Sequence, residues 1–371
     1  MKRQILPKVD NYLWWIVLIL VGIGLLMLSS ASSVLSYQRF GNNYYYLLRQ
    51  LLFGAIPGLI LMYVFSRIDY HVWQKFAPIL VFAGIGMLVA VLIPGIGFKV
   101  GNARRWINFG SFLFQPAEFI KLVMILYLAS WYDKRQHHMH DLYYGFLPSL
   151  AIVGVVAGLI ILEPDIGTML VLASIAAVMF FIGGVKMRYI YSTAASALLV
   201  LWILIKAAPY RAERFLAFLD PSVDSRGISY QINQALLAIG SGGWWGTGFG
   251  QSRQKYSYLP EPIGDSIFAI MSEELGFVRI CLILILFLFF AYRGFKIART
   301  APDTFGKLVA AGITSWIILQ ALINIGGITA VIPLTGIPLT FISYGSTAMA
   351  ISLAAMGILL NISRYSDLRA D

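Results

Sequence analysis

The chain has 371 residues, of which 59% are hydrophobic and 12% are charged, and its formal net charge at pH 7 is +11. Soluble domains carry roughly 25% charged residues, so this composition excludes an ordinary soluble protein and indicates that lipid covers much of the folded surface. The one cysteine, Cys281, excludes an intrachain disulfide and stands in an apolar run, where inert packing is expected.

Apolar segments that could cross a bilayer recur along the whole chain. A spanning helix needs about 20 mostly apolar residues. We therefore expect an all-α integral membrane protein, one polytopic domain over 1–371, with about ten transmembrane helices and a long, partly helical outer loop between spans seven and eight. The predicted spans are 14–35, 47–66, 76–95, 116–132, 145–162, 166–184, 188–207, 276–293, 306–326 and 343–362.

Lysine and arginine predict the orientation of these spans, because they accumulate in cytoplasmic segments. With the N-terminus in the cytoplasm, the cytoplasmic segments hold the larger share of both residues, by a small margin. Both termini are therefore expected in the cytoplasm. His137, His138 and His140 fall in a cytoplasmic loop, where a hydrophilic turn is favoured over a metal cluster.

Charged residues also occur inside or beside the predicted spans. Glu118 and Lys121 stand three residues apart, which places them on one face of a helix. Charges at membrane depth usually pair and face a cavity, so an ion pair is predicted, either structural or part of a site. Glu163 and Asp165 flank Pro164 in the tight turn between two spans, where they could simply form its polar end.

The outer loop, about 207–275, is rich in aromatic and apolar residues and also carries a concentration of lysine and arginine. A solvated surface loop and a site for an anionic substrate both fit, and the second is favoured. Within the loop, residues 229–239 have the apolar periodicity of an amphipathic helix, which Gly240 would end. The glycine-rich stretch 240–250 could bring backbone N–H groups close to a ligand, since glycine permits such an approach.

Arg253 and Lys255 follow this stretch, and a pyrophosphate group would suit such a mixture of amides and cations. Asp265 precedes a helical segment, so its ordinary role would be that of an N-cap. A role as catalytic base is compatible with capping. Glu273 and Glu274 stand at the start of the next span, where acidic residues are favoured by the helix dipole.

Short motifs occur in a fixed order along nearly the whole chain. They are ARRWI at 103–107, QPAEFIK at 115–121, EPDIGT at 163–168, FLDP at 218–221, GSGG at 240–243, SRQK at 252–255, LPE at 259–261, EELG at 273–276, GIPL at 336–339 and ISYG at 342–345. Together they resemble the SEDS family (shape, elongation, division and sporulation; FtsW, RodA and SpoVE), and the FtsW branch more than RodA. Thr340, Ser346 and the Pro262-Ile-Gly sequence before Asp265 depart from the usual family pattern.

The resemblance implies a peptidoglycan glycosyltransferase that polymerises lipid II at the outer face of the bacterial cytoplasmic (inner) membrane during septal wall synthesis. An acceptor 4-hydroxyl would displace undecaprenyl pyrophosphate with inversion, which needs one general base. By match to the family that base is Asp265. The implied cofactor is a divalent cation, Mg or Mn. The implied partners are a class B penicillin-binding protein (the transpeptidase) and other divisome membrane proteins, with no nucleic acid.

The remaining site residues follow from the same resemblance. Arg49, Arg105, Arg214 and Lys255 are predicted to bind the substrate diphosphate, and Glu118, Lys121 and Asp165 to support the cavity near Asp265. Three other functions stay open: a lipid II flippase or transporter, a non-catalytic division scaffold, and another lipid-linked transferase such as an O-antigen ligase. Intramembrane charges and the interrupted stretch 327–338 favour the transporter, whereas the gathering of polar motifs at one face favours the transferase.

Overall fold

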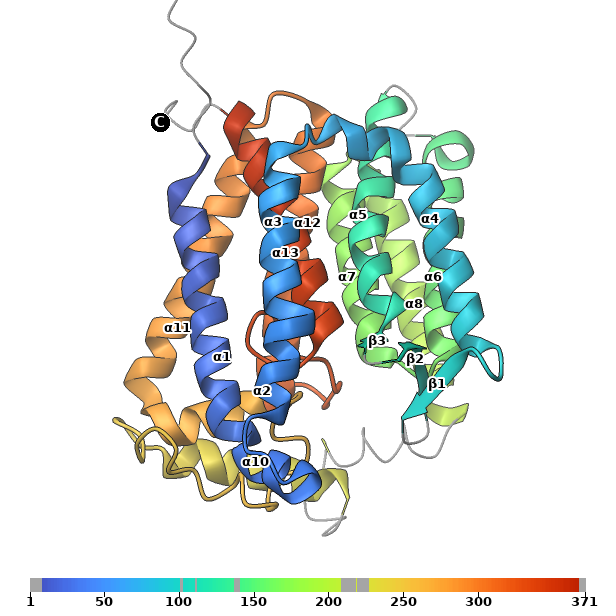
Figure 1. Ribbon diagram of the computed structural model, residues 1–371. Helices are drawn as coiled ribbons and strands as arrows, with labels where there is room; N and C mark the ends of the chain where they lie inside the picture. Colours follow the sequence, from blue (N-terminus) through green and yellow to red (C-terminus); the bar gives the residue numbers. More distant parts are fainter. Residues whose placement is uncertain are drawn as a thin grey trace, which may run out of the picture.

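The computed structural model of the protein describes residues 9–100, 103–110, 112–136, 141–207, 218 and 227–366. These residues form a bundle of long helices that run between two polar ends (Figure 1). Every predicted span corresponds to one helix or to two or three helical segments joined end to end. The bounds are α1 Asn11–Phe40, α2 Tyr45–Gln50, η1 Leu51–Ala55, α3 Ile56–Arg67, α4 His71–Leu92, α5 Pro116–Lys134, η3 Leu142–Phe146, α6 Leu147–Leu162, α7 Ile166–Ile182, α8 Met187–Ala207, α10 Ile228–Ser241, α11 Ile267–Thr300, α12 Thr304–Ile328 and α13 Ser346–Tyr365.

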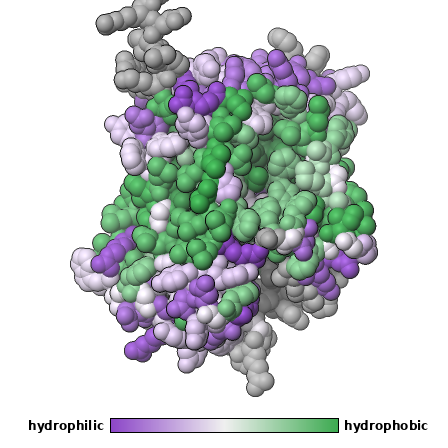
Figure 2. Space-filling view, in the orientation of Figure 1, coloured by the Kyte–Doolittle hydropathy of each residue, from purple (hydrophilic) through white to green (hydrophobic). Residues whose placement is uncertain are grey.

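The bundle has the surface of a multi-pass membrane protein. Among the described residues, 8 helices are long and apolar enough to cross a membrane, and α7 is a shorter apolar helix. Figure 2 shows hydrophobic residues across the middle of the face in view and hydrophilic residues gathered toward both ends. The predicted all-α membrane fold is therefore confirmed.

The two C-terminal helices form the centre of the bundle. In α12 and α13, 78% and 83% of the most apolar window is buried, whereas none of the corresponding window of α8 is. Close packing of α13 on α3 depends on small residues, because a Cβ on Gly58 would lie 3.0 Å from the Ala350 Cα and one on Gly357 would lie 2.6 Å from the Met62 carbonyl oxygen. Small residues at helix contacts allow this approach in membranes.

Both ends of the described chain lie at one end of the bundle. Asp10 is the N-cap of α1, and its carboxylate accepts from the amides of Tyr12 and Leu13. The same carboxylate pairs with Arg293 of α11 at 2.6 Å, and the Asp10 amide donates to the Ser363 hydroxyl of α13 at 3.1 Å. The beginning of α1 and the end of α13 are therefore tied together.

A small antiparallel sheet, which the sequence did not predict, joins α4 to α5 at the opposite end. Strands β1 (Gly97–Val100), β2 (Ala103–Phe109) and β3 (Phe112–Phe114) pair in the order β1-β2-β3. Gly110, with φ +73°, lies in the turn between the last two strands, a conformation that glycine adopts without steric cost. This end also carries α2 and α10 (Figure 1).

The chain between α12 and α13 is not helical, although it enters the protein interior. Residues 333–339 have no regular structure, and Ile337, Leu339 and Phe341 are buried. Non-helical backbone at such depth needs hydrogen-bond partners inside the protein. Buried glutamine and asparagine side chains from neighbouring helices provide them.

Candidate functional site

Asp265 lies at the end of a loop that enters α11, at the end of the bundle occupied by α10. Its half-buried carboxylate is 3.5 Å from Gln231 Nε2 at both oxygens, and Gln231 also donates to the Ser266 hydroxyl at 2.9 Å. Ser266 is the N-cap residue of α11 and no side chain caps this helix. The prediction that Asp265 caps the helix is therefore wrong, and its carboxylate is directed to the side chain of α10.

The backbone around Asp265 is held from two elements far away in sequence. Asn324 of α12 donates from one amide nitrogen to the Asp265 carbonyl at 2.9 Å and to the Ile337 carbonyl at 2.8 Å. Ser343 donates to the Gly264 carbonyl at 2.7 Å, and the Tyr344 amide donates to the Ile263 carbonyl at 2.8 Å. The loop before Asp265 and the interrupted segment before α13 therefore form one hydrogen-bonded unit.

The predicted ion pair of α5 lies against the same unit. Glu118 and Lys121 are 2% and 1% exposed, and the Lys121 ammonium is 2.9 Å from the Glu118 carboxylate, so the predicted pairing is confirmed. Lys121 also donates to Gln320 Oε1 at 2.8 Å, and Gln320 donates to the Pro338 carbonyl at 3.0 Å. The pair thereby reaches the interrupted segment one residue from the point where Asn324 holds it.

A cavity of about 110 Å³ opens beside the interrupted segment, between α2, the small sheet and the start of α13. Arg49 lines it, and its guanidinium lies 5.5 Å from the Tyr45 ring centre and 5.8 Å from that of Phe53. The other lining residues are Phe53, Trp106, Phe112, Leu113, Gln115, Tyr344, Gly345, Ser346, Thr347 and Ala348. Because Tyr344 is bonded to the Asp265 loop, the cavity and the carboxylate share a supporting segment.

Arg105 of β2 is engaged by the turn between α6 and α7. Its guanidinium donates to the carbonyls of Glu163, at 3.1 Å, and Pro164, and lies 3.6 Å from the Asp165 carboxylate. Asp165 caps α7 by accepting from the Thr168 amide at 3.1 Å. The structure thus gives Arg105 and Asp165 a shared role in fixing the sheet to the bundle, and their roles toward a substrate stay predictions.

Glu163 in this turn is fully buried, and neither of its carboxylate oxygens has a hydrogen-bond partner among the described residues. Burial raises the pKa of the Glu163 carboxyl to about 8, and the nearby Asp165 carboxylate adds to the increase while Arg105 opposes it. This raised pKa favours the protonated, neutral form of the Glu163 carboxyl near pH 7. Sequence alone suggested an ordinary polar turn.

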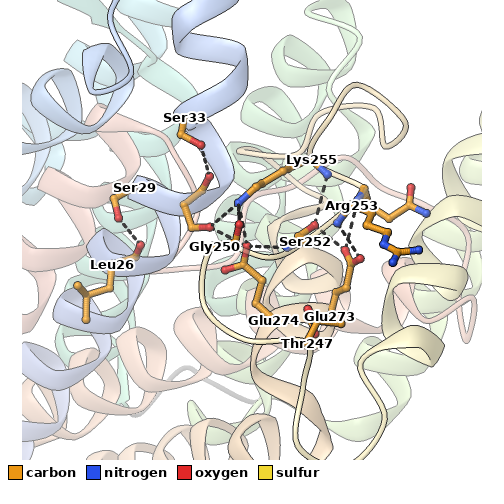
Figure 3. Close-up of polar contacts among 12 residues, drawn as sticks. Leu26, Ser29, Ser33, Thr247, Gly250, Ser252, Arg253, Lys255, Glu273 and Glu274 are labelled. Carbon is orange, nitrogen blue, oxygen red and sulfur yellow. Dashed lines mark hydrogen bonds and ion pairs between the residues drawn. The ribbon is translucent and has the colours of Figure 1, made fainter.

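Lys255 is buried beneath the glycine-rich segment (Figure 3). Its ammonium donates to the Gly250 carbonyl at 2.6 Å and lies 3.3 Å from the Glu274 carboxylate, which also accepts from the Ser30 hydroxyl of α1 at 2.7 Å. These contacts give Lys255 partners inside the protein. Contact with a substrate diphosphate stays a prediction for this residue.

Glu273 organises the backbone beside Lys255. Its carboxylate accepts from the Ser252 hydroxyl at 2.5 Å and from the Arg253 amide at 2.9 Å. The side chain of Arg253 is exposed. The amides of this segment thus bind a carboxylate of the chain itself, and Arg253 is the cation of this motif that faces outward.

Two predictions fall on residues outside the described part of the chain: the substrate contact of Arg214 and the loop containing His137, His138 and His140. Within the described residues, no group of three or more His, Cys, Asp and Glu side chains could hold a metal ion.

Three amide side chains that support the site belong to none of the motifs in the sequence. Gln320 and Asn324 hold the interrupted segment from α12, and Gln50 of α2 accepts from the Gly345 amide at 3.1 Å. All three are buried. They could have been found in the sequence as polar residues within otherwise apolar spans. Such residues in membrane helices usually face the protein interior.

The fold and this site define a polytopic membrane protein with a half-buried carboxylate and basic residues gathered at one end of the bundle. A family model for the FtsW, RodA and SpoVE cell cycle proteins matches residues 11–368. The chain belongs to this family, so the resemblance to SEDS proteins is confirmed.

Two relatives illustrate the similarity in sequence. Stage V sporulation protein E of Bacillus subtilis is 44% identical over 357 residues, which covers 96% of this chain and 97% of the relative. The probable peptidoglycan glycosyltransferase FtsW of Trichlorobacter lovleyi is 40% identical over 358 residues, with 96% and 94% covered.

Solved structures show the same fold. A chain from a peptidoglycan synthase complex, in a study of how polymerization and crosslinking are coordinated, superposes with a TM-score of 0.78 at 26% identity and covers 98% of this chain and 99% of that chain. The rod shape determining protein RodA of Thermus thermophilus gives a TM-score of 0.71, also at 26% identity, with 97% and 99% covered.

Proposed function

We propose that this protein is a peptidoglycan glycosyltransferase that polymerises lipid II at the outer face of the bacterial cytoplasmic membrane, with Asp265 as the general base. Family membership and relatives named as probable peptidoglycan glycosyltransferases support the activity. The observation that carries the residue assignment is the loop of Asp265. The backbone of this loop is fixed by Asn324 and Ser343, and the half-buried Asp265 carboxylate lies 3.5 Å from the Gln231 amide at the end of the bundle that carries α10.

In the proposed reaction the acceptor 4-hydroxyl oxygen forms a bond to C1 of the donor sugar as the bond from C1 to the pyrophosphate oxygen breaks. Asp265 takes the hydroxyl proton, and undecaprenyl pyrophosphate leaves with the bonding electron pair. Gln231 can hold the carboxylate in place while it accepts the proton.

The leaving diphosphate needs positive charge or hydrogen-bond donors as it develops. Of the predicted cations, Arg49 is the best candidate to bind the diphosphate. It lines the cavity beside the segment before α13, which is hydrogen-bonded to the Asp265 loop through Ser343. Bound Mg or Mn would neutralise further charge on the diphosphate. The proposed partner is a class B penicillin-binding protein, supported by the fold shared with a chain of a peptidoglycan synthase complex.

Purified protein reconstituted with its class B partner, lipid II and a divalent cation tests this proposal. The wild type should produce glycan chains on a gel, and Asp265→Asn should lower their yield by at least about 100-fold, the contribution typical of a general base. Asp141→Asn is the matched control, since asparagine can keep the capping bond to the Tyr143 amide at the start of η3.

Full polymerase activity of a folded Asp265→Asn protein would remove Asp265 from this role. Absence of polymer from the wild type with its partner present would refute the glycosyltransferase proposal. A lipid II flipping assay on the same proteoliposomes would then test the transporter alternative directly.

A further inference from the structure

A compact aromatic and basic patch lies where the glycine-rich segment meets α11. The patch consists of Trp244, Trp245, Phe277 and Arg279, and all four side chains are exposed to the surroundings of the protein. Each tryptophan is 68% exposed. The Trp244 and Phe277 rings contact edge to face, with centres 5.3 Å apart. Large aromatic side chains so exposed need a partner that accepts both apolar and polar groups.

The patch is fixed to the bundle by its backbone. At the kink in α11, Gly276 has φ +76° and a Cβ there would lie 2.1 Å from the Gly246 nitrogen, so the two chain segments are in direct contact. The Val278 amide donates to the Trp244 carbonyl at 3.2 Å. Arg279 donates from one guanidinium nitrogen to the Trp245 carbonyl at 2.6 Å. The two tryptophans therefore occupy a defined level along α11.

The exposed side of α11 identifies that level. Between Leu282 and Phe295 the exposed residues of α11 are apolar or aromatic. The nearest exposed charged residue before this stretch is Arg279, and the nearest one after it is Arg299. These arginines are about 20 residues apart, which corresponds to about 30 Å at 1.5 Å per residue. The hydrocarbon core of a bilayer is also about 30 Å thick. Arg279 thus lies at one boundary of the membrane, and Trp244 and Trp245 lie beside it.

We infer that Trp244, Trp245, Phe277 and Arg279 form a docking surface for the headgroup region of the bilayer, so that the glycine-rich segment is anchored in the membrane surface. Tryptophan favours this region because its ring is largely apolar and its N–H can donate to carbonyl or phosphate oxygens. Arg279 uses one guanidinium nitrogen to bind the Trp245 and Leu275 carbonyls, and the other donors of this guanidinium suit lipid phosphates.

The occupant is lipid because Arg279 stands about one helical turn before Leu282, which is 57% exposed and begins the apolar exposed side of α11. If the protein acts on a lipid-linked diphosphate, as proposed above, the anchor has a further consequence. Through Glu273 and Glu274 the same segment of α11 holds residues 252–255, so it would keep the loop leading to Asp265 at the depth of the substrate diphosphate.

Site-directed spin labelling of the full-length protein in nanodiscs tests the anchor without measuring polymerase activity. In a Cys281→Ser background, Trp244→Cys, Trp245→Cys and Phe277→Cys each place a single label on the patch. Leu282→Cys is the reference for the lipid interior and Asn43→Cys, an exposed loop residue at the same end, is the reference for water. Collision rates with oxygen and with a water-soluble nickel chelate give the depth of each label.

Labels on the patch should lie within about 5 to 10 Å of the phosphate level, the depth typical of interfacial side chains, between the two references. Thermal unfolding identifies any patch variant that does not fold. The labels at the other two patch positions then test the inference. Nickel accessibility equal to that of Asn43→Cys at the patch would overturn the inference. The inference would also be overturned if the patch labels became shielded from oxygen and from the nickel chelate only after a class B partner was added. That result would mean that the patch binds protein.

Discussion

The buried pair of Lys255 and Glu274 allows a decisive test of what Lys255 does. Lys255→Met leaves the fully buried Glu274 carboxylate with the Ser30 hydroxyl and the Ser252 amide as its remaining donors. Removing one partner of a buried ion pair costs roughly 3–5 kcal/mol. Because two donors stay, we expect about 3 kcal/mol, which lowers the melting temperature by about 6 °C at roughly 2 °C per kcal/mol for a large domain.

The double variant Lys255→Met with Glu274→Gln removes both charges together. Glutamine can still accept from Ser30 and Ser252, so stability should return to within about 1 kcal/mol of the wild type. Thermal unfolding in detergent and glycan synthesis are measured on the same preparations. If the double variant regains stability and polymerase activity, Lys255 acts through the fold. A stable double variant without activity, beside an active Glu274→Gln single variant, would refute this reasoning and place Lys255 at the substrate.

The other predictions concern the kink of α11, the turn before α7 and the support of the Asp265 loop. Gly276→Ala would place a Cβ 2.1 Å from the Gly246 nitrogen at φ +76°, so unfolding should become easier by about 3 kcal/mol; an unchanged melting temperature would contradict this. The raised pKa of Glu163, about 8 against 4.5 for an ordinary glutamate, favours the folded state at low pH, so stability should fall as pH rises from about 5 to about 8. Glu163→Gln should abolish this fall and be the more stable protein at about pH 8.5, and a melting profile that keeps its pH dependence would exclude Glu163 as the cause. Asn324→Ala removes the bonds to the Asp265 and Ile337 carbonyls and should lower kcat about 10- to 100-fold with little change in KM, by misplacing the base; full activity would show that the loop is held without it.

The membrane helices could be predicted from sequence because length and apolar composition determine them locally. The pairing of Glu118 with Lys121 could also be predicted, since three residues along a helix bring side chains together wherever the helix lies. The apolar periodicity of residues 229–239 predicted a helix, and α10 spans Ile228–Ser241. These features depend on neighbours in sequence.

The partners of Lys255 could not be predicted in this way. Ser30 is 225 residues away, and nothing near Lys255 distinguishes a cation that binds substrate from one that neutralises a buried Glu274. The support of the Asp265 loop by Asn324 is likewise a contact across 59 residues. The small sheet was missed because its strands are short, 3 to 7 residues, and acquire stability from packing on α4 and α5.

The contact between Asp10 and Arg293 has a consequence for the synthesis and membrane insertion of the protein. The carboxylate at the start of the first helix finds its arginine 283 residues later in the chain, an interval that takes about 15 to 60 s at ordinary rates of translation. Helix α1 therefore obtains its contacts with α11 only late in synthesis, although α2, which follows it directly, already packs against it. Until then the side of α1 that packs on α11 is left to lipid or to the insertion machinery, and ribosome pausing between α8 and α11 would prolong that state.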